Sequence, residues 1–258
     1  MLLQVGFHTL DFGSFVSEKA IPQMRDTAHV LEHLKTEESS TKLLAIVANQ
    51  RGAQEAITFK KLDSIGFPFS ISETFQLRNT NTTIEVSFNL LKTLRDLCET
   101  HKKEFVVYLS MAFGNPYNEP YAIEQVVEWA DILISEGIKV LYLADTCGNA
   151  QPHNIRTLFK TISSAHPAMD LGLHLHAAPS MRLEKIEAAW EAGCKRMDTT
   201  IRGYGGCPLA SDALIGNLPT EELLAFLNFK GVAPSLNLTA LEQAQELASH
   251  IFHSNTAK

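Results

Sequence analysis

Several features that mark common protein classes are missing from this sequence. No apolar run approaches the roughly 18 residues that a membrane-spanning helix needs, so we expect no membrane partner. The N-terminus has no charged stretch followed by an apolar one and does not resemble a secretory signal. No GxGxxG or Walker sequence occurs, although an open doubly wound sheet usually carries a glycine-rich phosphate loop early in the chain.

Cysteines and clustered basic residues are also scarce. The chain has four cysteines, which are too few for a disulfide scaffold and fall in no metal-type pairing. This usage fits a reducing compartment, so we expect a cytoplasmic protein. The formal net charge is −7 and the sequence shows no clustered basic face, so we expect no nucleic-acid partner.

The sequence does contain a repeated alternation of short apolar runs with amphipathic segments. The apolar runs predict seven strands, at Phe7–Phe12, Leu43–Ala48, Phe67–Ser72, Phe105–Ser110, Val140–Asp145, Leu171–His176 and Arg196–Ile201. Segments with helical periodicity lie between them, such as Ile84–Glu99 and Ile123–Ser135. Strands that are apolar on both faces indicate a parallel sheet covered by helices. Seven such units in a row favour an α/β fold of the closed TIM-barrel type.

A TIM-type barrel has eight strands, and the start of this chain does not fit that number. Residues Met1–Gly6 look like the last turn of a helix with its glycine cap, and the Phe7–Phe12 strand follows at once. We therefore interpret residues 1–258 as a single β/α-barrel domain with seven visible strands. In this interpretation the domain is truncated at the N-terminus and lacks strand one.

Two histidines at the end of the sixth predicted strand are the strongest candidates for a functional site. His174 and His176 are two apart on a strand, so both imidazoles point to the same side of the sheet. Imidazole is the commonest metal ligand in proteins, although a bare His-x-His is more often a hydrogen-bonded polar pair. The loop after the next strand adds a thiol at Cys207 and an amide at Asn217. Asp11 and Asp145 also lie in or at the end of predicted strands, where barrel enzymes place their chemistry.

Several motifs occur in one order along the chain, at Asp11–Met24, Ala144–Gly148, His174–His176, Gly205–Ala210 and Gly216–Glu221. Together they resemble the hydroxymethylglutaryl-CoA lyase family. This family is one branch of the barrel metallolyases, which also include isopropylmalate and citramalate synthases. The similarity runs from about residue 2 to about residue 232, and the Gly-Gly-Cys-Pro sequence favours the lyase branch.

The resemblance implies a role for each candidate residue. It makes His174, His176 and Asn217 ligands of a divalent cation, which we expect to be Mg²⁺ or Mn²⁺, with Zn²⁺ and Co²⁺ also compatible with the donor set. It makes Cys207 the catalytic cysteine of a loop that closes over the substrate. Asp145 and Asp11 match acidic positions near the metal, where many relatives carry glutamate in place of Asp11.

The implied reaction is the cleavage of an acyl-CoA substrate, 3-hydroxy-3-methylglutaryl-CoA, to acetyl-CoA and acetoacetate. Two departures from the family pattern keep other functions open. The family's first strand carries an Arg-Asp pair that has no counterpart in this sequence, and Ala177 stands where many relatives have aspartate. The alternatives are a related aldol- or Claisen-type enzyme acting on another acyl-CoA or 2-keto acid, and a catalytically impaired remnant. We expect residues 1–258 alone to pair with another chain, as in a homodimer, and to show no measurable cleavage.

Overall fold

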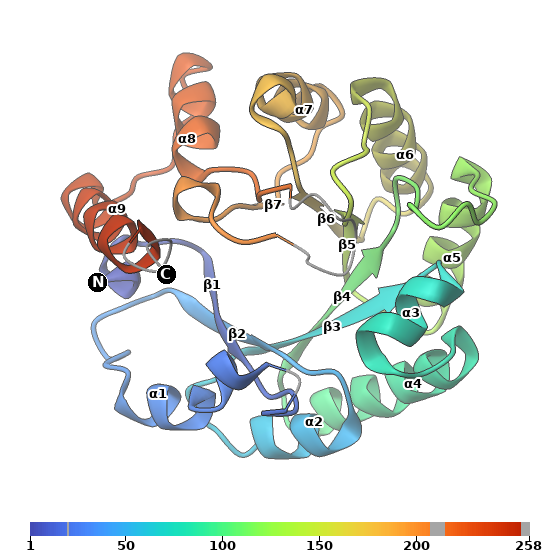
Figure 1. The fold of residues 1–258 in the computed structure, drawn as a ribbon, viewed down its shortest axis with the longest axis horizontal. Helices are drawn as coiled ribbons and strands as arrows, with labels where there is room; N and C mark the ends of the chain where they lie inside the picture. Colours follow the sequence, from blue (N-terminus) through green and yellow to red (C-terminus); the bar gives the residue numbers. More distant parts are fainter. Residues whose placement is uncertain (20, 207–214, 254–258) are drawn as a thin grey trace.

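The computed structural model describes residues 1–19, 21–206 and 215–253. Its seven strands are all parallel and lie in the sheet in their order along the chain. They are β1 (Thr9–Ser14), β2 (Lys42–Ile46), β3 (Ser64–Ser70), β4 (Glu104–Ser110), β5 (Val140–Asp145), β6 (Asp170–Leu175) and β7 (Met197–Asp198). Figure 1 shows the sheet curled inside a ring of helices. The predicted α/β fold with seven strands is confirmed.

Nine α-helices are present in the described residues. They are α1 (Thr27–His33), α2 (Gln50–Ala56), α3 (Glu73–Thr80), α4 (Ile84–Thr100), α5 (Ile123–Ser135), α6 (Pro152–Ala165), α7 (Arg182–Glu191), α8 (Thr220–Phe229) and α9 (Leu238–His253). Several begin with a side-chain cap; for example, the hydroxyl of Thr83 accepts a hydrogen bond from the Val86 N–H at the start of α4. None of these helices has the length and apolar character needed to cross a membrane.

The core has two layers because side chains of each strand alternate between the two faces of the sheet. The larger layer fills the space between the sheet and the outer helices and includes Phe67, Leu143 and Leu173. The smaller layer lies on the inner face of the curled sheet and includes Val106 and Tyr142. This inner face is the one that presents polar side chains at the carboxyl ends of the strands.

Gly172 makes room for an aromatic ring on the inner face. A Cβ atom at this position would lie 2.6 Å from the ring of Tyr142 on the neighbouring strand. Any larger residue would therefore push the Tyr142 ring out of its place. Tyr142 in turn stacks on Tyr108, with ring centroids 5.0 Å apart.

The bounds of β5 agree with the prediction, and those of the other strands differ by one to three residues at one or both ends. β3 begins at Ser64, three residues before the predicted Phe67, because Ser64 and Ile65 pair with β2 and β4. β7 is shorter than predicted and ends at Asp198. The N–H of Thr200 donates to the carbonyl of Leu218 and not to β6, so the chain leaves the sheet early.

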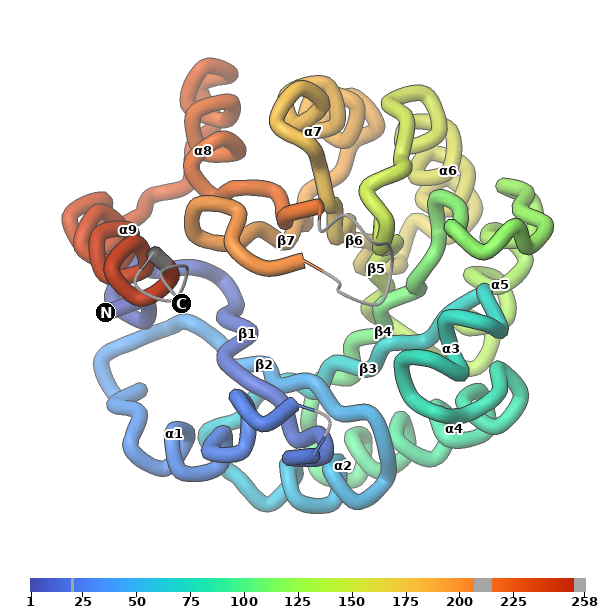
Figure 2. Tube along the Cα trace, viewed as in Figure 1, coloured from blue at the N-terminus to red at the C-terminus, as the bar shows by residue number. Residues whose placement is uncertain are grey.

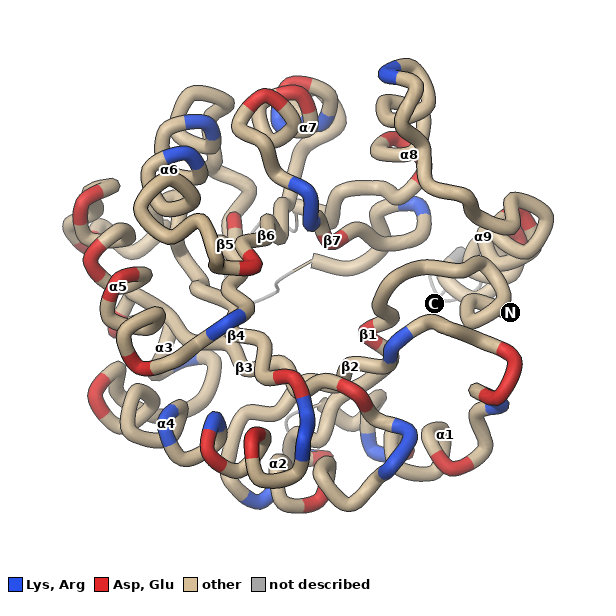
Figure 3. Tube along the Cα trace, turned by 180° about the vertical axis from the view of Figure 1, so that it is seen from behind, with Lys and Arg blue, Asp and Glu red and all other residues tan. Residues whose placement is uncertain are grey.

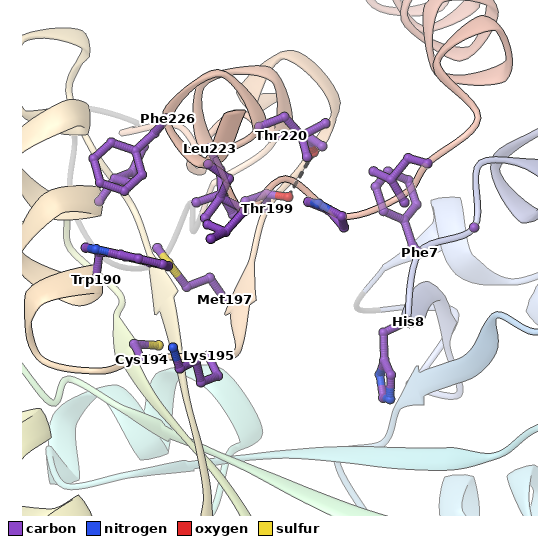
Figure 4. Close-up of a pocket in the computed structure, with 17 residues that line it drawn as sticks. Phe7, His8, Trp190, Cys194, Lys195, Met197, Thr199, Thr220, Leu223 and Phe226 are labelled. Atoms are coloured by element: carbon purple, nitrogen blue, oxygen red, sulfur yellow. Dashed lines mark hydrogen bonds between the residues drawn. The ribbon is translucent and has the colours of Figure 1, made fainter. Parts of the chain in front are cut away.

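The strands β1 and β7 are the two edges of the sheet, and a cavity of about 590 Å³ lies between the segment just before β1 and β7. Phe7 lines it from the β1 side and Met197 from the β7 side, while Trp190 and Leu223 line it from α7 and α8 (Figure 4). The cavity wall is therefore mostly apolar. Among the described residues, no strand pairing closes the sheet between β1 and β7.

The start of the chain lies beside α9, as Figure 2 shows. The predicted helix end at Met1–Gly6 is a 3-10 turn at Leu2–Gln4, and Gly6 has a φ of +90°. Val5 packs against α9, and its carbonyl accepts a hydrogen bond from the Asn237 N–H just before this helix. Figure 3 shows acidic and basic residues interspersed around the helical ring.

Candidate active site

His174 lies on the inner face of the sheet near the carboxyl end of β6. Its ring centroid is 5.3 Å from that of His176, so the two imidazoles lie side by side as the strand alternation predicts. The Nδ1 atom of His174 lies 3.1 Å from the Oδ2 atom of Asp198 on the neighbouring strand β7. Burial lowers the pKa of His174, but the hydrogen bond and the charge of Asp198 outweigh it and raise this pKa overall.

Asp198 was not among the residues singled out from the sequence. A carboxylate that holds one ring nitrogen of a histidine fixes the tautomer and orientation of that ring and leaves the other nitrogen free for a metal. The sequence did offer one sign that Asp198 has a special role, because it is a charged residue within a predicted apolar strand. The alternation of that strand, however, does not indicate which histidine it contacts.

His176 follows the end of β6 and is almost completely buried, with 4% of its surface exposed. Its side chain lies close to the side chain of Asn217 and the backbone of Thr146, and both act against the lowering of its pKa. Burial and the neighbouring His174 lower the pKa of His176 to about 4. His176 is therefore neutral at pH 7, which is the form that binds a metal ion.

Asn217 reaches this site from the loop before α8. Its backbone forms an isolated antiparallel bridge with His176, which places the two residues side by side. The Nδ2 atom of Asn217 donates to the carbonyl oxygen of Tyr204 at 3.0 Å. This contact fixes the amide so that its oxygen points away from Tyr204. The structure thus brings His174, His176 and Asn217 together, as the sequence predicts.

Asp145 ends β5, but its side chain turns away from the two histidines toward α7. Its Oδ2 atom lies 2.6 Å from the Nζ atom of Lys185, and both side chains are only 1% exposed. Burial raises the pKa of Asp145 and the Lys185 ammonium opposes this rise. The Asp145 carboxylate therefore forms a buried ion pair with Lys185 and does not point toward the candidate metal ligands.

Lys185 connects this ion pair to the candidate ligands. Its ammonium donates to three oxygens, namely Asp145 Oδ2 at 2.6 Å, the His176 carbonyl at 2.8 Å and the Gly148 carbonyl at 2.9 Å. Sequence reasoning missed Lys185 because a lysine on a helix is usually exposed. Ala188 and Ala189 lie three and four positions after Lys185, and this spacing is the one sequence signal that the lysine shares a face of α7 with small apolar residues. The structure buries all three.

Asp11 lies on β1, where water reaches its side chain. Desolvation by the surrounding protein and the negative charge of Asp198 raise the pKa of Asp11 to about 7. His174 acts in the opposite direction, so Asp11, Asp198 and His174 are close enough to influence one another. Because the side chain is exposed, solvent screens these interactions and limits their effect on stability.

Two tyrosines form the floor beneath the histidines. The ring of Tyr108 lies edge-on to His174, with centroids 5.9 Å apart, and stacks on Tyr142. The Tyr142 hydroxyl accepts a hydrogen bond from the Arg196 Nε atom at 2.8 Å. Burial raises the pKa of both tyrosines, so both hydroxyls keep their protons at neutral pH.

The predicted catalytic residue Cys207 lies outside the described residues.

The donor set fits a divalent cation. His174 and His176 offer two imidazoles from the same face, and Asn217 offers an amide oxygen beside them. Asp198 supports His174 in the way that carboxylates support metal-bound histidines. The mixture of nitrogen and oxygen donors suits Mn²⁺, Zn²⁺ or Co²⁺, and Mg²⁺ where water completes the coordination.

Comparison with known proteins gives the family. The model of the family described as HMGL-like matches residues 1–248. The chain belongs to this family. It is therefore a carbon–carbon lyase, and HMGL-like lyases depend on a metal ion.

Individual relatives agree with the family match. The hydroxymethylglutaryl-CoA lyase of Bacillus subtilis (strain 168) is 31% identical over 243 residues, which are 94% of this chain and 80% of that protein. The (R)-citramalyl-CoA lyase of Chloroflexus aurantiacus is 29% identical over 96% of this HMGL-like chain and 80% of its own length. The solved HMG-CoA lyase of Acinetobacter baumannii, in complex with coenzyme A and 3-methylmalate, has a TM-score of 0.88 at 29% identity. That alignment covers 96% of this chain and 80% of the solved one.

Proposed function

We propose that this chain cleaves 3-hydroxy-3-methylglutaryl-CoA to acetyl-CoA and acetoacetate. The observation that carries the proposal is the pair of imidazoles of His174 and His176, which lie side by side at the carboxyl end of β6. The named activity of the relative from Bacillus subtilis supports the same substrate. The complex of the solved relative with coenzyme A supports an acyl-CoA as the substrate class.

His174, His176 and Asn217 would hold the cation of this site. When bound, a divalent cation polarises the hydroxyl and carboxylate oxygens of the substrate and makes the hydroxyl more acidic. The chain's own residues keep this donor set in place. Asp198 orients His174, and Lys185 holds the backbone carbonyl of His176.

The proton chemistry requires a base and an acid. We assign the base to Asp11, because its carboxyl lies near His174 and Asp198 and its raised pKa of about 7 suits proton transfer near neutral pH. Asp11 takes the proton of the tertiary hydroxyl, the carbon–carbon bond breaks, and its electron pair forms the enolate of the acetyl thioester. Cys207 then supplies a proton to this enolate, which gives acetyl-CoA. In this scheme Asp145 positions the site through Lys185 and does not touch the substrate.

A second candidate substrate comes from one specific comparison. The relative from Chloroflexus aurantiacus is an (R)-citramalyl-CoA lyase, and it covers this chain as fully as the hydroxymethylglutaryl-CoA lyases do. Both named substrates are acyl thioesters with a tertiary hydroxyl. The donor set of His174, His176 and Asn217 acts on this shared group and does not by itself distinguish the two.

The test is an assay of acetyl-CoA release with both acyl-CoA substrates and Mg²⁺ or Mn²⁺. Variants His174→Ala and His176→Ala should lose bound Mn²⁺, whereas His101→Ala, at an exposed position after α4, should keep it. The assay is run on the chain alone and on the chain preceded by a strand that carries the family's Arg-Asp pair. Cleavage by either form supports the proposed reaction.

Each outcome of the assay bears on the proposal. Cleavage by the chain alone would support the reaction and show that the Arg-Asp pair is dispensable. Preference for citramalyl-CoA would replace the first substrate by the second. Unchanged Mn²⁺ binding in both histidine variants would overturn the metal site. Absence of cleavage in every form, with Mn²⁺ still bound, would overturn the proposed reaction.

A further inference from the structure

A second group of potential metal ligands lies on α1, outside the candidate active site. His29, Glu32 and His33 each offer one ligand atom, and these three atoms all lie within 4.8 Å of one another. All three residues are exposed. They are three and four positions apart, and side chains with this spacing share one face of a helix.

The ring of His33 is already held in a suitable state. Its Nδ1 atom lies 2.8 Å from the backbone carbonyl oxygen of His29. Only an N–H can donate to a carbonyl, so Nδ1 carries the proton and Nε2 keeps a free lone pair. A hydrogen bond from one ring nitrogen to a backbone carbonyl is the usual support of a metal-bound histidine. The rings of His29 and His33 lie next to each other, with centroids 4.2 Å apart.

The carboxylate of Glu32 is not used by a neighbouring cation. The ammonium of Lys61 lies at the same turn, but it donates to the backbone carbonyls of Glu32 at 3.0 Å and Leu34 at 2.6 Å. Among the described residues, no ion pair involves the Glu32 side chain. The carboxylate is therefore available to a metal ion.

We propose that His29, Glu32 and His33 form a surface site for a divalent transition-metal ion, Zn²⁺ or Cu²⁺. Two imidazoles and one carboxylate suit these ions, whereas Mg²⁺ prefers oxygen ligands alone. Three protein ligands leave room for water or another small ligand on the metal.

The proposed site lies apart from the candidate active site. The helix α1 starts after the carboxyl end of β1 and runs back toward the opposite end of the sheet. Lys61, which contacts its last turn, comes just before the start of β3. His33 therefore lies toward the amino ends of the strands, while His174 lies near the carboxyl end of β6.

The test counts metal ions on the full chain by equilibrium dialysis against Cu²⁺ and against Zn²⁺, in the presence of excess Mg²⁺. Electron paramagnetic resonance of bound Cu²⁺ reports how many nitrogen ligands it has. The chain that carries both His29→Ala and His33→Ala should lose one bound ion. The variant Glu32→Gln should bind this ion at least about tenfold more weakly, since it replaces a charged ligand by a neutral amide and even the loss of a supporting group typically costs this much. The control His101→Ala should match the unchanged chain.

Further variants keep the two sites distinguishable. The chain with His174→Ala and His176→Ala should keep the α1 ion, so a failure of the proposed active site does not affect this result. The single variant His29→Gln keeps the hydrogen bond from His33 to the backbone, so it tests the site without disturbing the helix end. Unchanged ion count and unchanged Cu²⁺ spectrum in the His29 and His33 variants would overturn the proposal.

Discussion

The Nζ atom of Lys185 on α7 lies 2.6 Å from the Oδ2 atom of Asp145 at the end of β5, and both side chains are buried. The same ammonium also holds the backbone carbonyl of His176. One buried lysine thus links a helix, the end of β5 and a candidate metal ligand. A charged pair that is shielded from water is costly to form and more costly to break, because breaking it leaves one buried charge alone.

The variant Lys185→Met should therefore be strongly destabilised. Methionine fills a similar volume but leaves the Asp145 carboxylate buried without its partner. We expect a loss of about 3–5 kcal/mol in the free energy of unfolding, which urea denaturation measures. We also expect weaker Mn²⁺ binding, because the backbone next to His176 loses a hydrogen bond.

A double variant is the control for this prediction. Replacing both partners, with Lys185→Met and Asp145→Leu, removes the isolated charge and should recover much of the lost stability. Mn²⁺ binding should remain weaker in the double variant, since the contact to the His176 carbonyl is still absent. If the double variant lost as much unfolding free energy as the two single variants together, the broken ion pair would not be the cause of the instability of Lys185→Met.

The variant Asp198→Asn should weaken metal binding without removing a metal ligand. Asparagine has the shape of aspartate but lacks the charge that supports His174. Loss of such a supporting carboxylate typically costs about 10–100-fold in metal affinity. Calorimetric titration with Mn²⁺ measures this change. Asp170→Asn is the matched control, because Asp170 lies at the other end of β6 and pairs with Arg196. Equal effects of the two changes would contradict the assignment.

His176 should make the metal-free chain sensitive to acid. Burial lowers its pKa to about 4 in the folded chain, against about 6.5 in the unfolded chain. Between these values the unfolded state binds more protons. The stabilising contribution is therefore complete above pH 6.5 and is lost as the pH falls through 4. The full loss corresponds to about 3 kcal/mol.

Urea denaturation of the metal-free chain at pH 7, 6, 5 and 4 measures this contribution. The stability of the His176→Gln variant should fall less steeply over this range than that of the unchanged chain. The control His101→Gln changes an exposed histidine and should follow the unchanged chain. Parallel curves for the chain and the His176 variant would show that His176 is not the responsible group.

Cys207 should affect the reaction and not the metal. Our proposal uses it to protonate the enolate, so the variant Cys207→Ser should lower kcat by a large factor. Bound Mn²⁺, measured on the same samples, should stay nearly unchanged. A loss of metal equal to the loss of activity would show that Cys207 belongs to the metal site. The assay uses the form of the chain that cleaves the substrate.

Much of this site follows from local sequence patterns. Alternation along β6 predicts that His174 and His176 share a face, and their rings do lie side by side. The repeated change between apolar runs and helical periods predicts the parallel sheet. Both predictions use spacing within one element, where the geometry of a strand or helix is fixed by the backbone.

Contacts between distant elements were not predictable in this way. Asp198 contacts a histidine 24 residues earlier, and Lys185 contacts a carboxylate 40 residues earlier. The family resemblance placed Asp145 near the metal. Ala144 pairs with His174 on the inner face, so Asp145, one position later, points toward the helices. A slip of one position along a strand moves a side chain to the other face. The face of β5 on which Asp145 lies therefore decided its role, although the end of this strand was predicted correctly.

In the part of the chain that the structure describes, β1 and β7 each have one edge that pairs with no other strand, and these edges should make the chain associate with a second copy. Free strand edges expose rows of N–H and C=O groups that favour pairing, and the cavity between them is lined by apolar side chains such as Phe7, Trp190 and Met197. We expect sedimentation velocity to show dimers or larger species at micromolar concentration. The variant Leu223→Lys places a charge in this cavity and should weaken association at least tenfold, because an unpaired ammonium is costly to bury. The control Val86→Lys changes an exposed residue of α4 and should have no effect. A chain that stays monomeric at every concentration would show that these edges are protected in another way.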